Sequence, residues 1–157
     1  MLFRSVAAVC NEIGAHRTAI RLSPVTPAND AFDADPQSLF EFVACELAKF
    51  NLMYVHLIEG ATGGERELAD RPFDYESLKA VYKTAGGMAA WMVNNGYDGK
   101  MADTALSEGA DLVSFGRPFI ANPDLVARLQ TGAPLNALDR KTLYGGGAVG
   151  YTDYQVL

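Results

Sequence analysis

Residues 110–124 of the chain read ADLVSFGRPFIANPD, a short apolar run that ends at a Gly–Arg pair and leads into a helix. An apolar run that contains Val113 and is closed by a glycine is typical of a buried parallel strand. Gly116 lets a ligand approach the backbone closely, and Arg117 supplies a forked cation suited to a phosphate. Asn122 is expected to cap the following helix. The stretch therefore predicts a strand, an anion site and a helix N-terminus.

Strands and helices alternate along the rest of the chain. Apolar runs predict strands over residues 18–24, 52–59, 88–93 and 111–115. Helical periodicity and end signals predict helices over residues 2–13, 36–49, 75–84, 98–108 and 122–130. Such alternation implies right-handed crossovers and a parallel sheet. Four βα units are half of a (β/α)8 barrel, a TIM-type α/β fold that needs about 250 residues.

A small doubly wound open sheet is the alternative architecture. It would normally carry its glycine-rich phosphate turn after the first strand, where this chain has Ser23–Pro24. The glycines and arginine follow the last two strands instead, where barrels commonly bind phosphate. The half barrel is therefore favoured. No low-complexity linker divides the chain, so residues 1–157 are predicted to form a single partial domain.

Composition narrows the classes of partner. The chain has 157 residues, of which 49% are hydrophobic and 20% charged, with a net charge of −6. This balance argues against nucleic acid or an anionic membrane as a partner, although it allows a phosphate ligand. Cys10 and Cys45 lie outside any zinc-binding spacing, so no metal site is expected and two free thiols fit a reducing compartment. The apolar N-terminus is too short to span a membrane and lacks a signal-peptide layout, so a cytoplasmic location is expected.

Three polar residues occupy the first two predicted strands. Arg21 interrupts an apolar strand, and a buried arginine needs either a carboxylate in the barrel wall or a ligand. His56 is more often a core residue than a catalytic one in such a setting, and no catalytic role is assigned to it. Glu59 ends the second strand, where barrel chemistry sits, or serves only to anchor the long flexible turn at 60–64.

The turns Asn95–Gly96 and Gly116–Arg117 each follow a strand directly. Because adjacent parallel strands end at the same edge, the two turns are expected to meet above the barrel. Glycine N–H groups and a helix N-terminus would then form an anion nest to which Arg117 adds a charged fork. The alternative is two ordinary βα turns with a surface arginine.

Three segments resemble the Old Yellow Enzyme family of FMN-dependent ene-reductases: IRLSP at 20–24, the stretch at 110–124, and YGGGAVGYTDY at 144–154. The resemblance places Arg21 beside the pyrimidine side of the flavin, where a cation stabilises negative charge on the reduced ring. It places Asn95, Gly96, Gly116 and Arg117 around the FMN phosphate. It also implies that Tyr151 lies near the flavin and that the loops 29–35 and 61–64 lie at the substrate mouth.

The resemblance covers only the C-terminal half of a typical family member. It implies an oxidoreductase that passes hydride from NADH or NADPH through FMN to an activated alkene. No stretch resembles the family's substrate-anchoring His/Asn or His/His pair or its proton-donating tyrosine, so no catalytic residue is assigned. A half barrel exposes two strand edges, which predicts self-association or pairing with an N-terminal half. The alternatives are an inactive half-barrel fragment or assembly module, and a barrel enzyme for a phosphorylated substrate without flavin.

Overall fold

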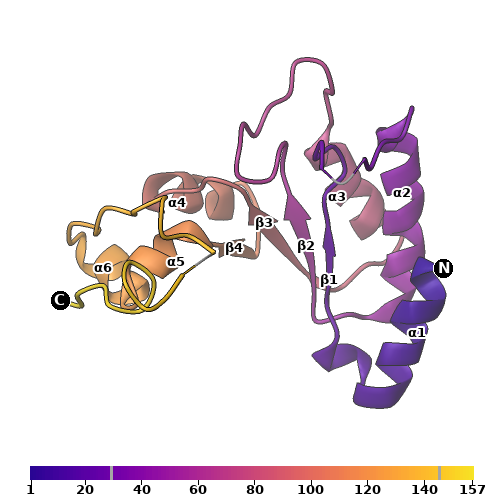
Figure 1. The fold of residues 1–157 in the computed structure, drawn as a ribbon. Helices are drawn as coiled ribbons and strands as arrows, with labels where there is room; N and C mark the ends of the chain where they lie inside the picture. Colours follow the sequence, from indigo (N-terminus) through magenta and orange to yellow (C-terminus); the bar gives the residue numbers. More distant parts are fainter. Residues whose placement is uncertain (29, 145) are drawn as a thin grey trace. The chain divides into compact units, whose positions relative to one another are not determined.

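A computed structural model describes residues 1–28, 30–144 and 146–157 (Figure 1). The described residues form two compact units, Met1–Ser114 and Phe115–Leu157, and each is described by itself. The single partial domain expected over residues 1–157 stays a prediction. Asn29 and Gly145, which belong to the predicted mouth loop and the glycine-rich tail, lie outside the described residues.

The first unit alternates helices with parallel strands. Its elements are α1 (Leu2–Ile13), η1 (Ala15–Arg17), β1 (Ile20–Leu22), α2 (Pro36–Leu47), η2 (Ala48–Phe50), β2 (Tyr54–Ile58), α3 (Tyr75–Thr84), β3 (Ala90–Asn94), α4 (Gly99–Ser107) and β4 (Leu112–Ser114). All neighbouring strands are parallel and the sheet order is β1-β2-β3-β4. A doubly wound sheet reverses its strand order at a switch point, whereas a barrel keeps chain order. The observed order therefore confirms the barrel-type arrangement.

The core lies between one face of this sheet and its helices. Val55, Leu57 and Trp91 alternate with residues of the opposite face and are almost completely buried. Tyr82 of α3 is fully buried against Trp91, with ring centroids 5.5 Å apart. Figure 1 shows α2 and α3 side by side, as their packing requires. Full burial of each large apolar side chain contributes about 1.5–3 kcal/mol, so this face holds the unit together.

Three helices of the first unit begin at an aspartate. The side chains of Asp35, Asp74 and Asp98 accept hydrogen bonds from the backbone N–H three residues further on, at 3.2, 2.8 and 2.8 Å. Each cap satisfies an N–H group that has no partner within its helix. The helix predicted over 36–49 is α-helical to Leu47 and then tightens into η2. The strands are shorter than predicted, except that β3 extends to Asn94.

The second unit corrects the helix predicted over 122–130. It holds two helices, α5 (Arg117–Ala121) and α6 (Leu125–Thr131). The prediction that Asn122 caps a helix N-terminus is wrong, because Asn122 ends α5 and Asp124 precedes α6. Pro118 is allowed in the first turn of α5, and the residue before Pro123 is pushed out of the helical region. The Asn122 side chain is buried and accepts from the Asn136 N–H at 2.7 Å.

Arg128 ties the C-terminal tail to α6. Its guanidinium donates to the Asp124 carboxylate at 2.7 Å, to the Pro134 carbonyl at 2.6 Å and to the Gln155 carbonyl at 2.9 Å. The Arg128 side chain is only 6% exposed. A buried guanidinium is tolerated because its donors are paired in this way.

No helix within the described residues has the length and apolar character needed to cross a membrane. The same residues contain no group of three or more His, Cys, Asp or Glu side chains placed to hold a metal ion. Cys10 and Cys45 are free thiols.

Candidate functional site

Arg21 lies on the face of the sheet that the helices leave open. It is in register with His56, which is in register with Met92, which is in register with Leu112. Arg21 is exposed and forms no ion pair with any described residue, so the premise that it is buried is wrong. The cause is its position, since Ile20 and Leu22 face the helices and Arg21 alternates to the other side. In a closed barrel this open face lines the interior.

His56 is a half-buried, hydrogen-bonded neighbour of Arg21. Its Nε2 lies 3.1 Å from Ser114 Oγ, and the Asn94 amide donates to the Ser114 carbonyl at 2.8 Å. Burial lowers the pKa of His56 from its usual value, and the positive charge of Arg21 lowers it further. The imidazole is therefore neutral at neutral pH, and Arg21 carries the positive charge on this part of the open face. Its bonded state fits the interpretation of His56 as a satisfied structural histidine.

Asn95 and Gly96 form the turn after β3. Asn95 has a φ of 118° and is buried, with only 4% of its surface exposed. Its amide donates to the carbonyls of Glu59 and Ala61 at 2.6 and 2.9 Å and accepts from the Gly63 N–H at 3.1 Å. Gly96 is exposed with a φ of 71°, and a Cβ there would meet nothing within 4 Å. The Asn95 side chain thus faces the neighbouring loop, while the Gly96 backbone is open to a ligand.

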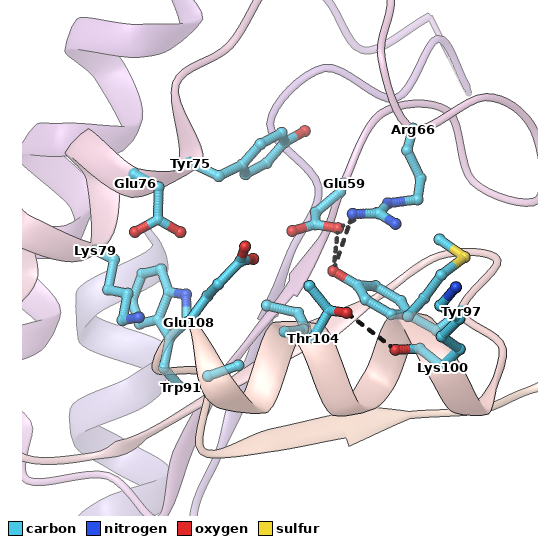
Figure 2. Close-up of a pocket in the computed structure, with 14 residues that line it drawn as sticks. Glu59, Arg66, Tyr75, Glu76, Lys79, Trp91, Tyr97, Lys100, Thr104 and Glu108 are labelled. Carbon is cyan, nitrogen blue, oxygen red and sulfur yellow. Dashed lines mark hydrogen bonds and ion pairs between the residues drawn. The ribbon is translucent and has the colours of Figure 1, made fainter.

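The carboxylate of Glu59 anchors the loop that follows β2. Its Oε2 accepts from the Tyr97 hydroxyl at 2.7 Å and from Arg66 Nε at 3.1 Å, as Figure 2 shows. Arg66 also donates to the Tyr97 hydroxyl at 3.2 Å and lies 4.2 Å from the centre of its ring. Burial, together with the nearby Glu59 carboxylate, raises the pKa of Tyr97 well above its usual value. We call Glu59, Arg66 and Tyr97 the anchor cluster.

Of the anchor cluster, sequence analysis identified only Glu59. Arg66 lies in a polar loop and Tyr97 follows a turn, and neither has a periodic or motif signal. The turn at 60–64, which the sequence predicts to be flexible, has an ordered hydrogen-bond pattern in the structure. Its backbone is closed by hydrogen bonds from Ala61 to Glu65 and from Gly64 to Ala61, each 2.8 Å long.

A cavity of about 470 Å³ lies between α3 and α4. Trp91 and Val93 contribute to its wall, so it belongs to the helix-covered face of the sheet. The anchor cluster closes one end of it (Figure 2). The cavity is consequently separate from the open face that carries Arg21.

The remaining predicted residues lie in the second unit. Gly116 is exposed, and a Cβ there would meet nothing within 4 Å. Arg117 follows as the first residue of α5 and is half-buried. Tyr151 is 44% exposed, in a turn where its N–H donates to the Ala148 carbonyl at 3.0 Å. The first unit holds Arg21, Asn95 and Gly96.

A sequential parallel sheet with polar groups at the carboxyl ends of its strands defines this class of protein as a partial (β/α)8 barrel. A model of the NADH:flavin oxidoreductase / NADH oxidase family matches residues 2–136, and the chain belongs to this family.

Relatives and solved structures agree with this assignment. The chain is 39% identical to 12-oxophytodienoate reductase 1 of Oryza sativa subsp. japonica, covering 97% of this chain and 40% of the relative. It is 40% identical to putative 12-oxophytodienoate reductase 10 of the same plant, covering 97% of this chain and 49% of the relative. The old yellow enzyme homologue of Zymomonas mobilis superposes with a TM-score of 0.88 at 34% identity, covering 99% of this chain and 43% of that one. The predicted family resemblance and barrel type are thereby confirmed, and the chain spans less than half the length of these relatives.

Proposed function

We propose that this chain binds FMN and supplies the C-terminal half of an Old Yellow Enzyme-type oxidoreductase. In this activity, hydride from NADH or NADPH passes through the flavin to an activated alkene. The observation that carries the proposal is the exposed guanidinium of Arg21 on the open face of the sheet, in register with His56. Family membership supports the flavin as the ligand of that face.

Each of the two units offers groups that are chemically suited to a phosphorylated flavin. Gly96 and Gly116 both leave space where any side chain would begin, which lets backbone N–H groups approach a phosphate. Arg117 adjoins Gly116 and offers a forked donor for the dianion. Arg21, an exposed cation of the first unit, is suited to the ring portion of a flavin.

The proposed roles of these residues rest on the family resemblance and on the charge of the two arginines. FMN, when bound, supplies the hydride-transfer chemistry, and the protein binds and orients it. Arg21 would stabilise negative charge on the reduced ring of a bound flavin. A neutral His56 leaves that positive charge with Arg21. From the family resemblance, Gly96, Gly116 and Arg117 would bind the phosphate and Tyr151 would lie near the flavin.

The test compares FMN with riboflavin, which lacks the phosphate. Arg117→Ala should weaken FMN binding by about 1.5–3 kcal/mol, the size of hydrogen bonds to charged groups, and leave riboflavin binding nearly unchanged. Arg21→Ala should weaken both ligands similarly and shift the flavin reduction potential. Arg4→Ala, which removes an exposed arginine of α1, is the matched control. Quenching of flavin fluorescence on titration measures each affinity.

The titration is made on the chain alone and on the chain mixed with the N-terminal portion of 12-oxophytodienoate reductase 1. Oxidation of NADH or NADPH with an activated alkene is then followed in the mixture. Equal loss of FMN and riboflavin binding in Arg117→Ala would overturn the phosphate assignment. Absence of flavin binding in both preparations would favour the inactive half barrel instead.

A further inference from the structure

We propose that Asn95 and the anchor cluster are positioning residues that hold the turn at Gly96 in the shape needed to bind the flavin phosphate. The inference rests on the proposed function and adds to it residues that would act through Gly96 without contacting the ligand by their side chains. The inference follows from the hydrogen bonds that the two neighbours of Gly96 form with the loop after β2.

The side chain of Asn95 holds the residue before Gly96 through three hydrogen bonds. Its φ of 118° lies in a region that costs free energy for any residue with a Cβ. Both amide hydrogens of Asn95 are used on the carbonyls of Glu59 and Ala61, and its oxygen is used on the Gly63 N–H. These bonds offset the strain and hold the backbone of residue 95 in one conformation.

The side chain of Tyr97 holds the residue after Gly96. The Tyr97 hydroxyl donates to Glu59 and accepts from Arg66, so residue 97 is tied to the same loop as residue 95. The Glu59 N–H also donates to the Asn94 carbonyl at 3.1 Å. Gly96 is thus the exposed link between two buried residues that share one support.

The supporting loop is itself held in place. The Gly60 N–H donates to the Tyr75 hydroxyl at 2.7 Å, and the Gly60 carbonyl accepts from Thr26 Oγ1 at 2.9 Å. These contacts connect the loop to α3 and to the segment after β1. The directions of the Gly96 and Tyr97 N–H groups depend on the dihedral angles of residues 95 and 96, so loosening the support would disperse the donors offered to a phosphate.

Two variants separate positioning from direct contact. Asn95→Gly removes the three side-chain hydrogen bonds of Asn95. Because glycine adopts a positive φ without strain, the variant tests these bonds alone. Tyr97→Phe keeps the ring beneath Arg66 and removes only the hydroxyl. Each should raise the Kd for FMN about tenfold, the effect of losing one or two hydrogen bonds, and change the Kd for riboflavin less than twofold. Asn51→Gly is the control, because Asn51 has a φ of 49° and is exposed at the end of η2.

A second measurement needs no flavin. Amide hydrogen exchange of the ligand-free chain should speed up at Gly63 in Asn95→Gly and stay unchanged in Asn51→Gly. Faster exchange at Gly63 with an unchanged ratio of the Kd for FMN to the Kd for riboflavin would overturn the positioning role. Unchanged exchange at Gly63 would show that the Asn95 side chain does not hold the loop. If the wild-type chain, alone and complemented, binds FMN no better than riboflavin, the proposed function fails and the positioning role with it. In that case the exchange data still show whether the Asn95 side chain holds the loop at Gly63.

Discussion

The backbone of the loop after β2 leaves no space for a side chain at Gly60. Its φ is +64°, and a Cβ there would lie 2.2 Å from the Glu65 carbonyl oxygen. Gly86 has a φ of +88° with nothing within 4 Å. Gly86→Ala should therefore lower the free energy of unfolding by about 1–2 kcal/mol, because alanine is strained in the left-handed conformation. Gly60→Ala should lower it by clearly more, because the backbone of the loop must also move. Urea unfolding of the two variants measures the difference, and equal losses would contradict the close approach.

Also at the residue scale, Arg128 controls the titration of Asp124. Hydrogen bonding from Arg128 is the main cause that lowers the pKa of Asp124 from 3.8, and the Leu157 N–H contributes. A lowered folded-state pKa means that the interaction stabilises the folded chain above pH 3.8 and is lost as the pH falls through the folded-state value. In Arg128→Met the Asp124 pKa should return toward 3.8, as an NMR titration of the carboxyl group would show. An unchanged titration would mean that Arg128 does not pair with Asp124 as described.

At the scale of the elements, α2, α3 and α4 each begin with an aspartate cap. Asp98 caps α4 through the Met101 N–H at 2.8 Å. Asp98→Ala should destabilise the chain by about 0.5–2 kcal/mol, because an N-cap bond is lost while the helix N-terminus keeps its unpaired N–H groups. Asp103→Ala, at an exposed position within the same helix, is the control and should change stability by less than about 0.5 kcal/mol. Thermal unfolding of both variants tests the cap, and equal effects would contradict it.

At the scale of the whole molecule, β1 and β4 are the outer strands of the sheet. Each has an edge without a strand partner among the described residues, and such edges promote pairing with other chains. We expect the chain to self-associate at micromolar concentration and to form a complex with the N-terminal portion of a relative in place of self-association. Sedimentation velocity with and without that portion measures both outcomes. A folded monomer that ignores the added portion would refute the expectation.

The sequence by itself determined the parallel half barrel, its family and most helix boundaries. The helix predicted over residues 2–13 matches α1, and the helix predicted over 75–84 matches α3. These features depend on periodicity and end signals that operate over a few residues, which a single sequence displays directly. The family motifs around Arg21 and Arg117 are likewise local in the chain.

Only the tertiary structure decided what the polar side chains do. Glu59 and Tyr97 are 38 residues apart in the chain, and nothing in their spacing indicates that they share a hydrogen bond. Asn122 has the residue type of a helix cap, yet its burial against the segment after α6 uses its side chain elsewhere. Asn95 was predicted as a ligand-binding residue, and the structure shows its amide occupied by the neighbouring loop. Such pairings depend on which strands and loops become neighbours, and that is settled by the packing of the whole sheet.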